Sequence, residues 1–301
     1  MADNTLDLTD GRVHVIDGGT GTELEALGVT MVDEAWCGMA NITHPEQVKA
    51  VHRLNIEAGA ELIIANTFAT SRHILEGAGF GDHFEAANRL GIELALTARD
   101  EAATASGRPP VPVAASISTA SFGGEQPPIE VARVNFADQV KILAEAGAEL
   151  FILEMMRDAE LTGVILDACE PTGLPIWVGY SCFLYDGDLR MTFRYGDFEL
   201  GDLLPSVADR RVELVAIMHT EVDLVDACLD IVDEHWDGPV GVYAHTGRFE
   251  PPTWVFNDTI SPADYADACD RWVARGVQVI GGCCGIRPHH IEVLRDRHPR
   301  P

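Results

Sequence analysis

Eight short apolar segments recur along the chain, and each is followed by residues with the spacing of an amphipathic helix. They span residues 13–17, 61–66, 111–117, 149–154, 175–181, 213–219, 239–245 and 277–282. Most are nearly continuous apolar runs, as in parallel strands that are buried on both faces. Helical periodicity between them is clearest at 45–59 and 136–147. Eight strands that alternate with helices predict an α/β fold, a closed (β/α)8 barrel of the TIM type.

A repeated string marks the ends of some of these units. EAGAEL occurs at residues 57–62 and 145–150, and a weaker copy surrounds Gly276. Each copy ends a helical pattern and leads into a strand, with a glycine between the two. Glycine is preferred just after a helix because it adopts the left-handed conformation without strain. We therefore predict that helices end at Gly59, Gly147 and Gly276. Since no linker interrupts the pattern, we predict one domain over residues 1–301.

The first turn after a strand argues against the common nucleotide-binding folds. Residues 17–24, DGGTGTEL, lack the GxGxxG spacing of a dinucleotide site. They also lack the GKS/T of a phosphate-binding loop. An open doubly wound sheet is therefore the less favoured alternative to the barrel. The two lysines, Lys49 and Lys141, fall in helical patterns, which disfavours Schiff-base chemistry at a strand end.

Charge limits the partners that the protein can have. Forty-eight acidic residues against 21 basic ones give a net charge of −27. Nucleic acids and anionic membrane surfaces would be repelled, so we expect small-molecule partners. The N-terminus has no apolar signal segment, and no apolar run reaches the roughly 18 residues needed to span a membrane. Seven cysteines without such a signal indicate reduced thiols and a cytoplasmic protein. The oligomeric state stays open.

The candidate chemistry lies at the predicted carboxyl ends of the strands, where barrels of this type place their active sites. The adjacent Cys283 and Cys284 lie between glycines in GGCCG, residues 281–285. Both can face a metal there because glycine permits unusual backbone dihedrals. Zn²⁺ takes three or four ligands of this kind, and His219, Cys182 and His245 are the candidates for the others. A buried thiol pair and a redox-active pair are the alternatives.

Several segments together resemble the homocysteine S-methyltransferases, which are zinc-dependent barrels that include enzymes with S-methylmethionine or betaine as donor. The matching segments are DGGTGTELEALG at 17–28, residues 44–71, AGAELFILEMM at 146–156, YAHTGRF at 243–249 and GGCCGIRPHHI at 281–291. The resemblance implies that Cys283 and Cys284 are zinc ligands. It also implies that Asp17, Gly18 and Glu154 hold the amino-acid end of homocysteine. We add Thr67, at the end of the second strand, as a substrate-binding candidate.

The chain departs from the family pattern at three places. His219 stands where the family has its third zinc cysteine, His245 replaces an asparagine, and Met155 follows Glu154. Sites with two cysteines and one histidine are known for zinc. We therefore predict one Zn²⁺ held by His219, Cys283 and Cys284. A metal held by Cys182 instead of His219, or no metal at all, is the alternative.

The predicted function is methyl transfer to the thiol of homocysteine or a close analogue, as part of methionine biosynthesis. Only about 16 residues follow GGCCG, so we expect a small onium donor, S-methylmethionine-like or betaine-like, rather than a folate or cobalamin module. Aromatic faces are natural partners for such a cation; the candidates are Trp36, Tyr243, Trp254 and Phe256. The alternatives are a metal-dependent hydrolase and a metal-free amino-acid-binding homologue.

Overall fold

The computed structural model describes residues 6–32, 35–120, 126–185, 187–191, 198–250, 253–255 and 260–300. Within these ranges eight parallel strands form one curved sheet in the order β1-β12-β9-β8-β5-β4-β3-β2. The strands are β1 (His14–Val15), β2 (Ile63–Ala65), β3 (Val113–Ser118), β4 (Leu150–Glu154), β5 (Ile176–Tyr180), β8 (Leu214–Glu221), β9 (Val240–His245) and β12 (Val279–Ile280). Each falls on one of the eight predicted segments, two of which it extends by one or two residues, so the predicted barrel is confirmed.

The first and last strands of the sheet order meet at a seam. The Glu61 N–H donates to the Val15 carbonyl over 2.7 Å, which joins β1 to the residues before β2. The Ile64 N–H then donates to the Asp17 carboxylate over 2.8 Å, where a strand carbonyl would otherwise accept. The Asp17 carbonyl instead accepts from Gly282 on the other side. Asp17 thus links β2 to the segment that follows β12.

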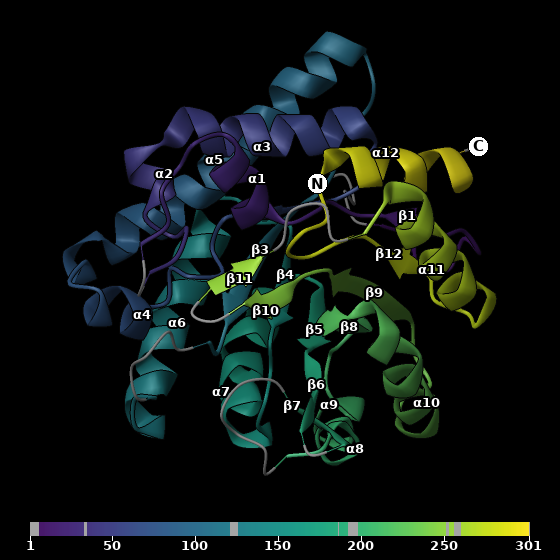
Figure 1. The fold of residues 1–301 in the computed structure, drawn as a ribbon. Coiled ribbons are helices and arrows are strands. Elements are labelled where there is room, and N and C mark those ends of the chain that lie inside the picture. Colours follow the sequence, from purple (N-terminus) through teal and green to yellow (C-terminus); the bar gives the residue numbers. More distant parts are fainter. Residues whose placement is uncertain are drawn as a thin grey trace.

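Helices surround the strands on the outside (Figure 1). They are α1 (Thr20–Ala26), α2 (Ala40–Thr43), α3 (Pro45–Ala58), α4 (Arg72–Gly77), α5 (Phe84–Ser106), α6 (Ile129–Glu145), α7 (Ala159–Cys169), α8 (Leu200–Leu203), α9 (Pro205–Ala208), α10 (Val225–His235), α11 (Pro262–Ala274) and α12 (Pro288–Arg297). Three short 3-10 helices span Gly81–His83, Glu170–Thr172 and Val222–Leu224. Among the described helices, none is long and apolar enough to cross a membrane.

The three predicted glycines follow helices in the left-handed conformation. The φ angle is 118° at Gly59, 104° at Gly147 and 102° at Gly276. Gly59 directly caps α3, and each of the other two lies two residues beyond the last residue of its helix, α6 or α11. Each glycine therefore ends a helix and turns the chain back toward the next strand, as the repeat predicted.

Alternate side chains of each strand face opposite sides of the sheet, and two apolar layers result. On β4, Leu150 and Ile152 belong to the cluster inside the barrel, while Phe151 and Leu153 pack in the layer under the helices. The same alternation holds on β8, where Leu214, Ala216 and Met218 face inward. The whole inner cluster comprises Ile16, Leu62, Ala114, Leu150, Ile152, Trp177, Leu214, Ala216, Met218, Tyr243 and Val279. Glu154 continues the inward series of β4 and so reaches the mouth of the barrel.

Two hairpins that the sequence pattern did not predict interrupt the βα units. Strands β6 (Cys182–Tyr185) and β7 (Asp188–Met191) pair after β5, and β10 (Arg248–Glu250) and β11 (Thr253–Val255) pair after β9. Both are inserted after the carboxyl end of a barrel strand. The β10–β11 hairpin crosses in front of the barrel strands in Figure 1. Cys182 therefore begins a hairpin, where the sequence had placed it at the end of the fifth strand.

Candidate metal and substrate site

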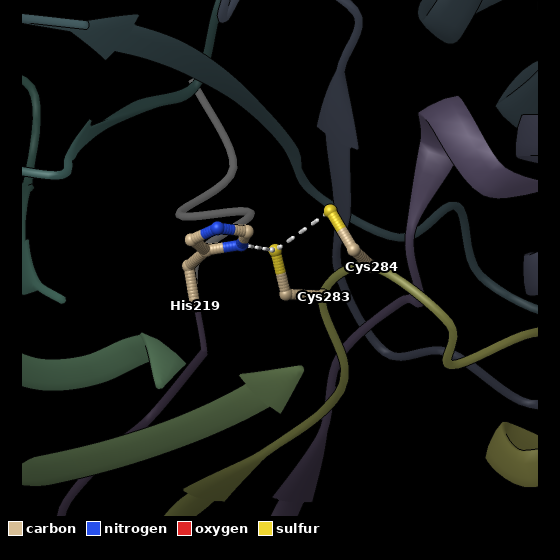
Figure 2. Close-up of side chains that lie close together, drawn as sticks. All are labelled: His219, Cys283 and Cys284. Atoms are coloured by element: carbon tan, nitrogen blue, oxygen red, sulfur yellow. Dashed lines mark hydrogen bonds between the residues drawn. The ribbon is translucent and has the colours of Figure 1, made fainter. Parts of the chain in front are cut away.

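Three side chains of the kinds that bind metals meet at the carboxyl end of the barrel (Figure 2). The ligand atoms of His219, Cys283 and Cys284 all lie within 4.8 Å of one another. His219 Nδ1 is 3.4 Å from Cys283 Sγ, and the two sulfurs are 3.8 Å apart, which is far beyond a disulfide bond. His219 comes from β8, and the cysteines come from the loop after β12. These are the three residues that the sequence predicted as ligands.

A β-bulge directs His219 into the site. Strict alternation would turn residue 219 away from the barrel interior, because Met218 faces inward. The pairing of β8 with β9 shifts register between Met218 and Glu221, and His219 adopts a φ of 42°. Such bulges add a residue and re-aim side chains next to active sites. The Ser181 hydroxyl holds the bulge by donating to the His219 carbonyl over 2.6 Å.

The cysteine loop packs directly on the glycine-rich turn at the start of the chain. The Gly19 N–H donates to the Ile286 carbonyl over 2.8 Å, and the Gly285 N–H donates to the Thr22 hydroxyl over 3.0 Å. A Cβ on Gly19 would lie 2.5 Å from the Cys283 carbonyl oxygen, so only glycine fits without a shift of the loop. The two motifs meet because β1 and β12 are neighbours in the sheet.

Asp17 places a buried carboxylate beside this loop. One oxygen accepts from Ile64 at the seam; the other, Oδ1, is buried and has no hydrogen-bond partner among the described residues. Burial, with the negative charge of Glu154 nearby, raises the pKa of Asp17 well above its usual value. Asp17 does not cap α1, because Gly19 is the residue that precedes this helix. Its free oxygen fits a cationic ligand.

Glu154 is the second buried carboxylate at the mouth. The Ser116 hydroxyl, on the neighbouring strand β3, donates a short hydrogen bond to it. The Tyr243 side chain from β9 lies close by. Burial raises the pKa of Glu154 to about 7, although the bond from Ser116 acts in the opposite direction. Two buried carboxylates that repel each other are stabilised by a cation that pairs with them.

Gly18 and Thr67 serve the framework of the site in this structure. The Gly18 N–H donates to the Asn55 side chain on α3. The Thr67 hydroxyl donates to the Ser116 carbonyl and accepts from the Ser116 N–H, so it bridges the ends of β2 and β3. Both groups are therefore engaged with the protein, and they hold the segments that carry Asp17 and Ser116.

The remaining candidates take different positions. Cys182 is buried in the outer apolar layer, where its thiol lies 3.9 Å from the Met191 sulfur, outside the ligand cluster. His245 is buried beside His219, and burial lowers its pKa to about 3. Met155, after Glu154, packs on the inner cluster with a φ of 55°. Ser116 is a site residue that the sequence did not predict; its inward position on β3, two residues after Ala114, was the available signal.

Of the four aromatic candidates for donor binding, two have described side chains. Trp36 lies in the loop before α2 and packs edge-on against Phe68, with ring centroids 5.9 Å apart. Tyr243 is buried inside the barrel. The Trp254 side chain and Phe256 lie outside the described part of the structure. Trp36 is thus a partly buried aromatic face next to the turn that carries Asp17, since its ring closes on Gly21.

Comparisons with known proteins agree with this architecture. The chain is 28% identical to homocysteine S-methyltransferase 2 of Zea mays, with 96% of this chain and 90% of that protein covered. It is 25% identical to a selenocysteine Se-methyltransferase of Brassica oleracea var. italica, with 95% and 89% covered. The metallated form of the homocysteine methyltransferase MmuM from Escherichia coli shares the fold, with a TM-score of 0.78, 22% identity and coverage of 96% and 98%.

A sequence model of a whole family also matches. It is described as homocysteine S-methyltransferase, and it covers residues 14–298, which include all eight barrel strands and both glycine-rich motifs. The chain therefore belongs to the homocysteine S-methyltransferase family.

Proposed function

We propose that the protein is a zinc-dependent methyltransferase that moves a methyl group from a small onium donor to the thiol of homocysteine or a close analogue. One observation carries the proposal: a His-Cys-Cys cluster lies at the same barrel mouth as two buried carboxylates. The first feature suits a thiol and the second suits an α-ammonium group. The product with homocysteine is methionine, so we place the enzyme in methionine biosynthesis, in the cytoplasm.

The donor set fits zinc. Imidazole nitrogen and thiolate sulfur are its usual protein ligands, and three of them leave a position for a substrate. The neighbouring Cys284 thiol and burial raise the pKa of Cys283 well above its usual value. A bound cation would therefore be needed for both cysteines to be thiolates. When bound there, Zn²⁺ would lower the pKa of an acceptor thiol and favour the thiolate at neutral pH. The metallated form of MmuM supports a metal in this barrel.

Asp17 and Glu154 are proposed to bind the amino-acid end of the acceptor. The unpartnered Oδ1 of Asp17 and the carboxylate of Glu154 would pair with the α-ammonium, and such charge-assisted bonds are strong when water is excluded. Ser116 orients Glu154 through its hydroxyl. Gly18 and Thr67 hold the ends of the first two strands in place.

The donor is proposed to be a methylsulfonium or betaine-type cation, with S-methylmethionine first. The acceptor sulfur attacks the methyl carbon, and a new C–S bond forms while the bond from that carbon to the onium atom breaks. The electron pair leaves with the donor, which becomes a neutral thioether or amine. Trp36 offers the cation an aromatic face near the site. Placing both substrates in line is the main contribution of the protein.

Metal analysis combined with a screen of donors against acceptors tests the function. We expect one zinc per chain and an X-ray absorption first shell of two sulfurs and one nitrogen. His219→Ala should lose most of the zinc, whereas His219→Cys should keep it. Cys182→Ala, which removes a buried thiol from the outer layer, is the matched control and should keep zinc.

Two outcomes would overturn the proposed function, and one would change the ligand set. Three sulfurs in the first shell would move the ligand role from His219 to Cys182. Zinc without methyl transfer to any thiol would favour a metal-dependent hydrolase. A protein that binds homocysteine but no metal would favour a binding homologue.

A further inference from the structure

The imidazole rings of His219 and His245 lie against each other at a tilt. Their centroids are 4.5 Å apart and the ring planes are inclined by 39°. His245 is only 4% exposed, so the surrounding protein fixes its position, while His219 is more exposed. His245 reaches the site by ordinary alternation on β9, on the same side as Tyr243. The ring of the more exposed side chain therefore lies against a buried one.

His219 needs such a support because strand pairing does not fix its direction. It lies in the bulge of β8, outside the regular register. The bond from Ser181 holds the backbone carbonyl of His219 and does not contact its ring. Contacts to the ring itself must then set where Nδ1 points. Cys283 contacts the edge of the ring at Nδ1, and the His245 ring lies against it at a tilt.

The strand that carries His245 also holds both cysteines. The Cys283 N–H donates to the Ala244 carbonyl over 2.9 Å, and the Thr246 N–H donates to the Cys284 carbonyl over 3.0 Å. These two bonds flank His245 in the sequence. The end of β9 thus contacts all three residues of the cluster. Its backbone bonds to the two cysteines, and the His245 ring contacts the His219 ring.

We propose that His245 is a positioning residue for the metal site, which holds the His219 ring at the angle that its Nδ1 needs to ligate together with Cys283 and Cys284. It is not a fourth ligand, because the cluster of close ligand atoms among the described residues contains His219, Cys283 and Cys284 and leaves His245 out. The inference rests on the proposed function only in that His219 must bind the metal.

Two substitutions separate support by the ring from ligation by its nitrogens. His245→Ala removes the ring, and His245→Phe keeps an aromatic ring against His219 but has no nitrogen. The dissociation constant for Zn²⁺ is measured by competition with a chromophoric chelator. The visible spectrum of the Co²⁺-loaded protein reports the ligand geometry independently of activity. The melting temperature of the metal-free protein reports folding.

We expect His245→Ala to bind Zn²⁺ about 10- to 100-fold more weakly, as is usual when a partner of a metal ligand is lost, and to have a changed Co²⁺ spectrum. His245→Phe should stay within about threefold of the wild type, with the wild-type spectrum. His14→Ala is the matched control. It removes a buried imidazole at the first residue of β1, at the end of the barrel opposite the site, and should leave zinc affinity unchanged.

Unchanged affinity in His245→Ala would overturn the inference, and so would an equal loss in His245→Phe and His245→Ala, which would indicate a ligand. If His245→Ala does not fold, His245→Asn replaces it, because it removes the ring and keeps a polar group. The two proposals fail in different ways. A wild-type protein that binds neither Zn²⁺ nor Co²⁺ overturns the proposed function itself, whereas zinc binding that depends on His219 but not on His245 overturns only the positioning role.

Discussion

Glu154 is a carboxylate in an apolar setting, and its environment decides its charge. Burial raises its pKa to about 7, from an ordinary value of 4.5. The folded protein thus binds the proton more tightly than the unfolded chain. Between these two pH values, the stability of the substrate-free protein falls as the pH rises, because the unfolded chain ionises first. An ammonium group that pairs with the ionised carboxylate offsets this cost.

Replacing Glu154 by glutamine should therefore weaken acceptor binding. One charge-assisted hydrogen bond contributes about 1.5–3 kcal/mol, so the KM for homocysteine should rise about 10- to 100-fold. Zinc content should not change, since Glu154 is outside the ligand cluster. Steady-state kinetics and metal analysis measure the two effects. An unchanged KM would assign Glu154 a purely structural role.

The pH dependence of acceptor binding follows from the same raised pKa. Below about pH 7 Glu154 is protonated and attracts the α-ammonium less. The KM of the wild type should thus fall as the pH increases from about 6 to about 8, with the raised pKa of Asp17 acting in the same direction. Glu154→Gln should show a flatter profile. Parallel profiles in the two proteins would show that another group titrates.

At the scale of the element, the bulge in β8 is the feature on which the site depends. The bulge turns the His219 side chain from the outside of the barrel to the inside. His219 has a φ of 42° there, a conformation that non-glycine residues adopt only when their surroundings hold them in it. Ser181 and Thr220 provide hydroxyls at this point: Ser181 donates to His219, and Thr220 accepts from Cys182 and donates to Met218. Two adjacent strand ends thus brace the bulge.

Loss of the Ser181 hydroxyl should affect the metal more than the fold. Ser181→Ala removes a 2.6 Å bond to the His219 carbonyl. Ser206→Ala removes a bond of the same type and length, to the Leu203 carbonyl between α8 and α9. Each should lower the free energy of unfolding by about 0.5–1.5 kcal/mol. Only Ser181→Ala should also weaken zinc binding, measured by chelator competition; equal zinc affinity in both variants would contradict the role of the bulge.

The whole molecule carries a net charge of −27. Its arginines are matched by clusters of acids; Arg275, for example, pairs with Asp226, Asp230 and Asp233. Such exposed pairs contribute little individually. The unmatched carboxylates repel one another across the surface, and this repulsion acts on the compact state more than on the extended chain.

Salt should therefore stabilise the protein. Screening at about 1 M NaCl shortens the Debye length to about 3 Å and removes most of the repulsion. A gain of about 1–2 kcal/mol corresponds to a melting temperature higher by about 2–8 °C than at low salt. Calorimetry across a series of NaCl concentrations measures this, with sucrose as a control for non-ionic effects. A falling melting temperature would indicate that the surface ion pairs outweigh the repulsion.

The barrel could be predicted from local signals because each of its parts is encoded locally. Strands buried on both faces require continuous apolar runs, and the eight runs found in the sequence are the eight barrel strands. Helix ends require a residue that tolerates the left-handed conformation, and Gly59, Gly147 and Gly276 supply it. The positions of Asp17, Glu154 and Cys283 at one mouth follow from parallel strands that all end on the same side.

The sequence by itself thus determined the number of strands, their direction and the types of chemical group at the mouth. Only the tertiary structure decided how those groups meet. The turn of His219 into the site, its contact with His245 and the closing of the seam by Asp17 all depend on pairing between strands far apart in the chain. A bulge strains the backbone, and a buried side-chain bond across a seam requires desolvation of polar groups. Contacts with neighbouring strands offset these free-energy costs, so the sequence of a single segment does not indicate either feature.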